Sequence, residues 1–283
     1  MADEFILSLS CPDRRGIVQA VAGLLAERGA NILSSQQFGD PAVGTFFMRV
    51  HFAAEEGGDH GAWSGAIGSL AASWQMRWDL HDVAIRPRVL ILVSRQGHCL
   101  NDLLFRWRSG ALQVDIVGVG SPHDDFAALT ATYGLPYHRL PGRAASVEER
   151  DAALLDLVEA EAVDLVVLAR YMLLLGPRAC ALLSGRAINI HHSFLPSFKG
   201  SSPYRQAHER GVKLIGATAH YVTEDLDEGP IIEQEVARVD HSHDAAELAR
   251  VGRDVECMAL SRAVRWHAEH RVLLDGRRTV VFR

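Results

Sequence analysis

Cysteine is scarce in this sequence: only four of the 283 residues are cysteines, and they stand far apart. Cys11, Cys99, Cys180 and Cys257 form neither a Cys-x-x-Cys pair nor the spacing of a zinc site. We therefore expect reduced, mainly structural thiols, as in a cytoplasmic protein. The 14 histidines include no His-Glu-x-x-His motif or similar ligand set, so no metal site is expected.

Blocks of positive charge and long apolar runs are also missing. The formal net charge is −6 and no basic cluster occurs, which argues against nucleic acid as a partner. No apolar run approaches the roughly 20 residues that cross a membrane, and residues 1–5 are acidic where a signal peptide would be basic. No Gly-x-Gly-x-x-Gly motif follows a predicted strand, which disfavours a dinucleotide-binding dehydrogenase. We expect a cytoplasmic protein without a membrane partner.

The composition is that of a globular protein. Hydrophobic residues make up 48% and charged residues 23% of the chain, so there is ample material for a core. The length suits one large domain or two ordinary ones. Residues 85–88, Ile-Arg-Pro-Arg, form a short polar linker, after which the chain changes in character. We therefore predict one domain over residues 1–84 and a second over residues 88–283.

The first predicted domain has the element order β-α-β-β-α-β, which is typical of a ferredoxin-like fold. Apolar residues at helical spacing follow the turn at residues 11–16, and Gly29 ends that helix. The predicted strands are residues 4–10, 31–38, 45–52 and 75–83, and the predicted helices are residues 17–28 and 63–74.

The second predicted domain alternates apolar strands with helices. Residues 89–93 are an unbroken apolar run, as expected of a parallel strand that is buried on both faces. This alternation predicts an α/β domain with a mostly parallel, Rossmann-like sheet covered by helices on both faces. The further strands are predicted at residues 114–119, 136–140, 164–168, 188–191, 213–223 and 231–239, and the helices at residues 98–108, 125–133, 146–162, 177–183, 203–210 and 244–270, before a hairpin over residues 272–282.

Two polar side chains share one face of the strand at residues 188–191. Ile188 and Ile190 alternate with Asn189 and His191, and residues two apart on a strand point to the same face. The strand then breaks into a loop, and in open α/β sheets sites form at such carboxyl ends. A histidine and an asparagine satisfied by nearby backbone groups would be the structural alternative. Two polar groups together on one face favour a site.

A second strand offers a similar pair. Thr218 and His220 lie two apart, and an acidic loop over residues 224–230 follows, closed by Gly-Pro. One carboxylate of that loop could reach an imidazole on the neighbouring strand. Spacing alone cannot choose among the four candidates, which are Glu224, Asp225, Asp227 and Glu228.

The first domain resembles an ACT domain, a small regulatory module. The cues are Cys-Pro-Asp-Arg-Arg-Gly at residues 11–16 and Gly-Ala-Asn-Ile at residues 29–32. The resemblance implies that copies of the chain pair as a homo-oligomer and bind an amino-acid effector near the first turn. Asp13, Gly16 and Asn31 are the candidate effector residues. A domain that only mediates dimer contacts is the alternative.

The second domain resembles the formyltetrahydrofolate-using transferases, a superfamily that includes glycinamide ribonucleotide transformylase and methionyl-tRNA formyltransferase. The resemblance covers roughly residues 88–283. It rests on four motifs in order: Asn-Ile-His at 189–191, Leu-Pro-Ser-Phe-Lys-Gly at 195–200, Gly-Ala-Thr-Ala-His at 216–220 and Leu-Asp-Glu-Gly-Pro at 226–230.

This resemblance implies a catalytic trio of Asn189, His191 and Asp227. Attack on the formyl carbon would create an oxyanion that Asn189 and a protonated His191 could stabilise. Asp227 would favour the imidazolium if the two are in contact. The expected substrate-binding residues are Arg170, Tyr171, Met172, Leu173 and Leu175, with Thr218 and His220 in supporting positions on the neighbouring strand.

The combination of both domains resembles the formyltetrahydrofolate deformylases. His-His-Ser-Phe at residues 191–194 fits that branch, and the turn at residues 94–101 lacks the Gly-Ser-Asn core with which a transferase cradles the phosphate of its acceptor. The implied reaction is hydrolysis of the substrate 10-formyltetrahydrofolate by water to tetrahydrofolate and formate, without a cofactor, as part of one-carbon and purine metabolism. Formyl transfer to an amine is the alternative. A third reading is an inactive transferase fold that senses an amino acid.

Overall fold

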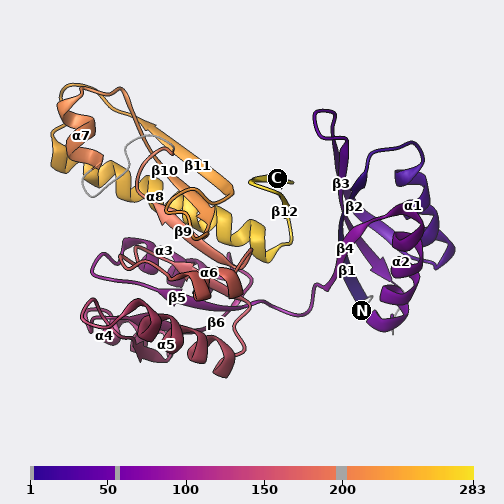
Figure 1. The fold of residues 1–283 in the computed structure, drawn as a ribbon, viewed down its shortest axis with the longest axis horizontal. Helices are drawn as coiled ribbons and strands as arrows, with labels where there is room; N and C mark the ends of the chain where they lie inside the picture. The colour runs from indigo at the N-terminus through magenta and orange to yellow at the C-terminus, as the bar shows by residue number, and fades with distance from the viewer. Residues whose placement is uncertain (1–2, 55–57, 196–202) are drawn as a thin grey trace. The chain divides into compact units, whose positions relative to one another are not determined.

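The computed structural model describes residues 3–54, 58–195 and 203–283 of the chain. The described chain forms two compact units (Figure 1). The first comprises Met1–Arg86 with Glu269–Asp275 and Val280–Arg283, and the second comprises Pro87–Ala268 with Gly276–Thr279. The α/β fold class predicted from the sequence is confirmed in both units.

The first unit is a four-stranded antiparallel sheet with two helices. The strands lie in the order β2-β3-β1-β4, which is the ferredoxin-like arrangement predicted from the sequence. One apolar face of the sheet and the inner faces of both helices share a core that includes Phe52, Trp63 and Ile67. The elements are β1 (Asp3–Pro12), α1 (Ile17–Glu27), β2 (Asn31–Asp40), β3 (Thr45–Ala54), α2 (His60–Trp74) and β4 (Arg77–Asp82).

Both ends of α2 differ from the prediction for local reasons. The helix begins at His60, ahead of residue 63, because the Asp59 carboxylate accepts a hydrogen bond from the backbone N–H of Gly61 at 2.9 Å. Gln75 takes a left-handed φ of 56° just after the helix and turns the chain. Strand β4 therefore starts at Arg77 rather than at residue 75.

The last residues of the chain group with this first unit. The Arg49 guanidinium is 3% exposed and donates to the carbonyl oxygens of Glu269 and His270 at distances from 2.9 to 3.3 Å. Gln36 likewise donates to the carbonyl of Arg283 at 2.8 Å. The division drawn from the sequence placed these residues with the second domain, because hydrophobic patterning does not show long-range contacts of this kind. As a statement about folding domains, that division stays a prediction.

The second unit is built on a seven-stranded sheet in the order β11-β10-β9-β8-β5-β6-β7. Strands β5 to β9 run parallel, as the sequence predicted. The strands are β5 (Arg88–Leu92), β6 (Asp115–Ser121), β7 (Tyr137–Arg139), β8 (Leu165–Leu168), β9 (Ala187–His191), β10 (Leu214–Tyr221) and β11 (Ile231–Arg238), and the helices are α3 (His98–Arg108), α4 (Ala127–Thr132), α5 (Val147–Ala160), α6 (Pro177–Leu182), α7 (Pro203–Glu209) and α8 (Ala245–Ala268). A hairpin of β12 (Val272–Asp275) and β13 (Arg278–Val281) ends the chain.

Two strands at one edge run antiparallel, which the alternation of elements did not reveal. Strand β10 pairs antiparallel with both β9 and β11. Strand β10 begins at the edge of the sheet where β9 ends, and the two strands pair from Thr218 opposite His191 to Tyr221 opposite Ile188.

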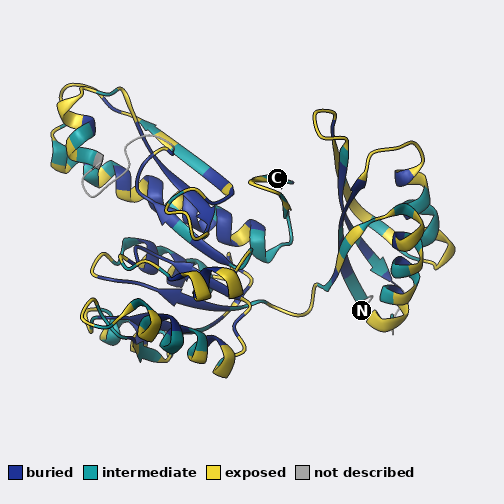
Figure 2. Cartoon of the chain, viewed as in Figure 1, coloured by how far each residue is buried: buried dark blue, intermediate teal, exposed yellow. Residues whose placement is uncertain are grey.

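The central strands of the second unit's sheet are mostly buried, whereas the edge strands β7 and β11 are partly exposed (Figure 2). Helix α8 packs on β9, β10, β11 and α3, and α5 packs on α6. The buried Asp151 of α5 accepts hydrogen bonds from the backbone N–H groups of Gly176 and Ala179 at 2.8 and 3.0 Å. This carboxylate caps the first turn of α6 and fixes the end of the loop that follows β8.

None of the described helices is both long and apolar enough to span a membrane. All four cysteines are free thiols, and Cys11, Cys99 and Cys180 are buried, as the sequence led us to expect. The cytoplasmic location stays a prediction.

Candidate functional site

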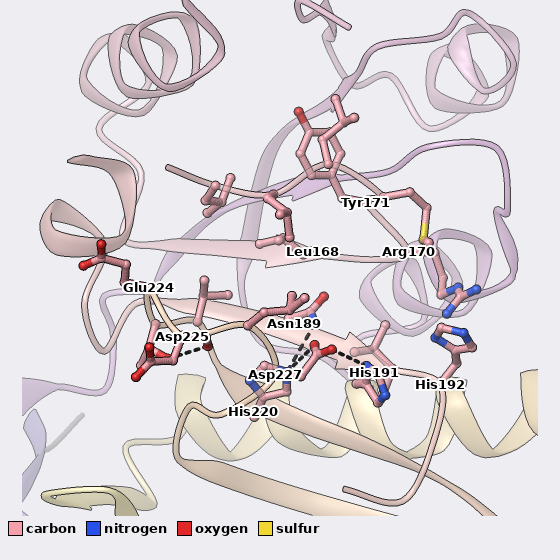
Figure 3. A pocket seen from close by; sticks show the side chains of 18 residues that line it. Leu168, Arg170, Tyr171, Asn189, His191, His192, His220, Glu224, Asp225 and Asp227 are labelled. Carbon is pink, nitrogen blue, oxygen red and sulfur yellow. Dashed lines mark hydrogen bonds and ion pairs between the residues drawn. The ribbon is translucent and has the colours of Figure 1, made fainter. Parts of the chain in front are cut away.

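A cavity of about 340 Å³ opens at the carboxyl ends of β8 and β9. The loop after β8 forms one wall, and the acidic loop after β10 forms the other (Figure 3). Most of the residues predicted for the site line it: Arg170, Tyr171, Met172, Leu173, Leu175, Asn189, His191, His220 and Asp227. Their assignment to catalysis or substrate binding stays a prediction, but the structure brings them together.

The register of two antiparallel strands places the polar side chains. Asn189 lies opposite His220, and His191 lies opposite Thr218. Residues directly opposite each other in a pair of strands point to the same face. The two polar pairs, predicted separately from period-two spacing, therefore form one polar patch at the end of β9.

His191 is held between two partners. Its Nδ1 lies 3.1 Å from Oδ2 of Asp227, and its Nε2 lies 2.8 Å from the hydroxyl of Ser193. The His191 and Asp227 side chains are only 6% and 12% exposed. A hydroxyl can donate to a neutral imidazole or accept from an imidazolium, so Ser193 can follow a change in the charge of His191.

The position of Asp227 depends on a tight turn at Gly229, where the loop after β10 packs closely against that strand. A Cβ on Gly229 would lie 1.8 Å from the carbonyl oxygen of Tyr221, so only glycine lets the loop close against β10. Asp227 itself has a φ of 57°, a left-handed conformation that costs a non-glycine residue about 1 kcal/mol. Burial raises the pKa of Asp227, but hydrogen bonding and the charges of His191 and His220 outweigh this and hold the pKa well below its ordinary value.

Asn189 is oriented by its strand neighbour. The Nδ1 of His220 lies 2.8 Å from the carbonyl oxygen of Tyr221, which fixes a proton on that nitrogen and leaves Nε2 as the acceptor in the neutral ring. The Asn189 amide lies 3.3 Å from this Nε2. The same Nε2 lies 3.7 Å from Oδ1 of Asp227. When the ring is neutral, Nε2 can accept one N–H of the Asn189 amide, and none of the described residues is recorded as accepting the second N–H.

Thr218 lies behind the cavity rather than in its wall. The side chain is fully buried, and its hydroxyl donates to the carbonyl of Ser193 and accepts from the backbone N–H of Leu195 at 3.0 and 3.1 Å. These bonds tie β10 to the segment after β9, and the supporting position expected of Thr218 stays a prediction. The predicted motif at residues 195–200 lies outside the described residues from residue 196 onward.

A buried ionic network that the sequence did not predict adjoins the site. The Glu256 carboxylate of α8 is 1% exposed and lies 2.7 Å from His98 Nε2, 2.7 Å from the Tyr204 hydroxyl and 3.5 Å from Arg170 Nε. The Arg170 guanidinium also donates to Oε1 of Gln96. Burial raises the pKa of Glu256, but the bond from His98 and the charge of Arg170 outweigh it and leave the pKa lowered.

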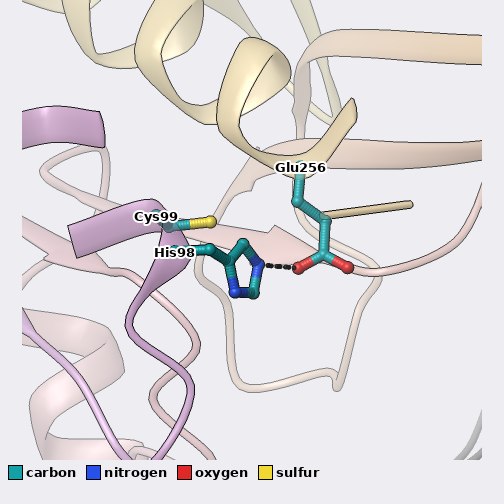
Figure 4. A group of neighbouring side chains, drawn as sticks. All are labelled: His98, Cys99 and Glu256. Carbon is teal, nitrogen blue, oxygen red and sulfur yellow. Dashed lines mark hydrogen bonds and ion pairs between the residues drawn. The ribbon is translucent and has the colours of Figure 1, made fainter. Parts of the chain in front are cut away.

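Within this network, His98, Cys99 and Glu256 place possible ligand atoms within 4.8 Å of one another (Figure 4). The donor set does not suit a cation. A hydrogen bond to Cys257 and burial raise the pKa of Cys99, which keeps the thiol protonated, whereas metals bind thiolates. Glu256 is already paired with the Arg170 cation. The cluster fits an ion-pair network better than a metal site.

The residues predicted to bind an effector lie in the first unit. Asp13, Gly16 and Asn31 are exposed, and Gly16 precedes α1 with a left-handed φ of 95°. Their turn is anchored on α2, because the Arg14 guanidinium lies 4.2 Å above the Trp74 ring and donates to the carbonyl of Ser73. Their role stays a prediction.

His192 is a buried neighbour of the trio. It lines the cavity, is 9% exposed, and is kept neutral: burial and the positive charge of Arg170 lower its pKa to about 4. The sequence predicted no role for His192 beyond its place in the His-His-Ser-Phe motif at residues 191–194, which resembles the deformylases.

This pKa predicts a pH-dependent stability. Between pH 6.5 and 4 an unfolded imidazole is protonated but the folded His192 is not, so the unfolded state binds more protons and stability falls as pH falls. From pH 6.5 to 5, the free energy of unfolding in urea should fall by about 2 kcal/mol more in the wild type than in His192→Gln. Parallel pH curves for the two proteins would contradict this.

Comparison with known proteins agrees with this geometry. The chain matches the formyl transferase family model over residues 87–264 and the ACT domain model over residues 5–60. It is 48% identical to a formyltetrahydrofolate deformylase of Corynebacterium sp. (strain P-1), with 98% of each chain covered.

Solved structures show the same relationship. A crystal structure of formyltetrahydrofolate deformylase from Burkholderia mallei ATCC 23344 matches with a TM-score of 0.94 and 53% identity, over 99% of this chain and 100% of that one. Glycinamide ribonucleotide transformylase 1 from Symbiobacterium toebii matches 70% of this chain and 95% of its own, with a TM-score of 0.65 and 33% identity. On both sequence and structure, this chain belongs to the formyltetrahydrofolate deformylase family.

Proposed function

We propose that this chain hydrolyses 10-formyltetrahydrofolate to tetrahydrofolate and formate. Its relatives over the full length are formyltetrahydrofolate deformylases. The observation that carries the proposal is the His191–Asp227 pair, 3.1 Å apart and nearly buried, in one cavity with Asn189. The site residues and their roles below are our assignment.

The first step is attack of water on the formyl carbon. The formyl group on N10 is a formamide, so addition of water places a negative charge on its oxygen. The second N–H of Asn189 donates to this oxygen, and a protonated His191, held between Asp227 and Ser193, stabilises the charge. Donors fixed before the reaction are worth most in such a buried site.

The second step releases the amine. As the water oxygen bonds to carbon, the Asp227 carboxylate accepts one of the two water protons. The C–N10 bond then breaks as N10 receives a proton from the His191–Asp227 pair. The formic acid that leaves carries the oxygen and the second proton of the water, and it releases this proton to become formate. His191 can change its charge during this transfer because the Ser193 hydroxyl serves either protonation state.

The wall beside the trio supports water rather than an amine as the acceptor. The turn after β5 carries Gln96 and His98, which contact Arg170 and Glu256. The turn thus takes part in an ion-pair network instead of offering the glycine-rich core that cradles an acceptor's phosphate. Formyl transfer to an amine needs groups that position the second substrate, whereas water needs none.

The direct test is to mix the protein with 10-formyltetrahydrofolate and no amine and to assay formate. We expect formate and tetrahydrofolate in equal amounts at full rate, and no formylation or inhibition when glycinamide ribonucleotide is added at modest concentration. A reaction that stays silent until an amine is supplied would establish the transferase alternative instead.

Substitutions in the trio test the assigned roles. Asp227→Asn removes the charge that holds His191, so kcat should fall about 10²-fold or more while the fold is kept. Asn189→Ala removes one oxyanion donor and should cost about 10² to 10³ in kcat, with KM nearly kept. The control is Asp156→Asn on the exposed face of α5. Wild-type turnover in Asp227→Asn would refute its assignment.

We also infer that the ACT unit binds a free amino acid and that residues 4–84 take part in assembling a homo-oligomer. The exposed turn with Asp13 and Gly16 and the match to the ACT domain support this. A ligand of the folded state should raise the melting temperature. Calorimetry with each of the twenty amino acids tests it, and no heat with any of them would leave only the assembly role, which the mass in solution checks.

A further inference from the structure

The C-terminal segment, which contains the hairpin of β12 and β13, is divided between the two units. Its two arms, Glu269–Asp275 and Val280–Arg283, belong to the first unit, whereas its tip, Gly276–Thr279, belongs to the second. The chain thus enters the second unit at the tip and then returns to the first. A hairpin that is held at both ends can carry a change from one unit to the other.

The four-stranded sheet of the first unit, here the ACT sheet, holds both arms. The buried Arg49 guanidinium of β3 donates to two carbonyl oxygens at the start of the first arm. Arg271 donates to Oε1 of Gln36 on β2 at 3.3 Å, and Gln36 donates to the C-terminal residue at 2.8 Å. The rings of His81 and His270 stack with their centroids 3.5 Å apart. Because a buried cation without acceptors is costly, the first arm is firmly attached.

The tip of the hairpin holds the loop that carries Asp227. Nη2 of Arg277 lies 3.3 Å from Oε2 of Glu228, the residue that follows Asp227. The Thr279 hydroxyl donates to the carbonyl oxygen of Ile231 at 2.6 Å, at the point where β11 begins. The end of the acidic loop is therefore held by the tip as well as by the tight turn against β10.

The position of this loop matters because Asp227 has little tolerance for a shift. Its φ of 57° is a conformation that a non-glycine residue keeps only when its surroundings impose it. Its carboxylate lies 3.1 Å from His191, and a shift of about 1 Å in the reacting geometry can cost about 10²-fold in rate. Contacts at the tip that add little to stability can therefore have a larger effect on turnover.

We propose that the terminal hairpin positions Asp227 and thereby makes turnover depend on the ACT unit. This inference rests on the proposed function. While the ACT sheet holds the arms, the tip holds the acidic loop and Asp227 stays in contact with His191. A change in the sheet that loosens the arms also loosens the tip. Strand β2 carries both Gln36, which binds the arms, and the candidate effector residue Asn31, so an amino acid bound there acts on the trio through this hairpin.

The test is a double-mutant cycle on kcat. Arg49→Met releases the arms, and Arg277→Ala/Thr279→Val releases the tip. Each variant should lower kcat about threefold to tenfold and change KM less than about twofold, as expected of residues that act on the chemistry through another group. Because both act through one hairpin, combining them should lower kcat no further than the larger single effect. Losses that multiply, or wild-type kcat in the tip variant, would overturn the proposal.

Hydrogen exchange tests whether the acidic loop itself responds. In Arg49→Met the backbone amides of residues 224–231 should exchange faster, while those of β1, β3 and α5 stay protected because both units remain folded. Gln36→Ala is a milder change at a half-buried position and should shift exchange in the same direction, so the test stands if Arg49→Met does not fold. Unchanged exchange of the loop in Gln36→Ala and in every folded variant contradicts the proposal.

The matched controls are Arg77→Met on β4 and Arg253→Ala on α8. Each removes a positive charge from an exposed position, one in the first unit and one in the second, and should leave kcat and exchange as in the wild type. Formate release by the wild type reports the proposed function by itself, and exchange needs no turnover, so the failure of either idea can be recognised.

Discussion

The buried contact between His191 and Asp227 is the interaction on which the arrangement of the cavity depends. A charge that is nearly excluded from water is costly without a partner, by several kcal/mol for a carboxylate. Strand β9 supplies the imidazole and the loop after β10 supplies the carboxylate, so the pair ties the strand that carries Asn189 to the opposite wall. The left-handed backbone at Asp227 persists because this contact and the close turn at Gly229 both require it.

The network around Glu256 holds the neighbouring wall of the cavity together, as the His191–Asp227 pair holds the trio together. It joins the start of α3, helix α7, helix α8 and the loop after β8 through a single carboxylate. Arg170, a non-glycine residue with a φ of 64°, enters this network and lines the cavity as well. Its charge also helps to keep His192 neutral. Contacts through one buried carboxylate therefore hold these segments of the wall together.

Local patterns account for what the sequence could predict. The period-two alternation of Ile188 and Ile190 with Asn189 and His191 identified both the strand and its polar face, and capping signals such as Ser146 marked helix starts. The direction of a strand depends on its pairing with residues far away in the sequence. The sequence therefore did not predict that β10 pairs antiparallel with β11. Spacing could not select Asp227 among four carboxylates; only the family resemblance did. His98 and Glu256 are 158 residues apart in the sequence, and no local sequence pattern predicts a contact between them.

Hydrolysis and formyl transfer differ here in the surroundings of the trio. The transformylase that matches 70% of this chain shares the fold of the second unit, so the fold alone does not decide the acceptor. The oxyanion donors and the proton-carrying pair serve attack by either nucleophile. Beside them lies the network in which Gln96 and Glu256 both contact Arg170. Because a buried charge without its partner is costly, Arg170 and Glu256 hold this wall in place. The acceptor is therefore decided by whether the space next to this wall positions a second substrate or only water.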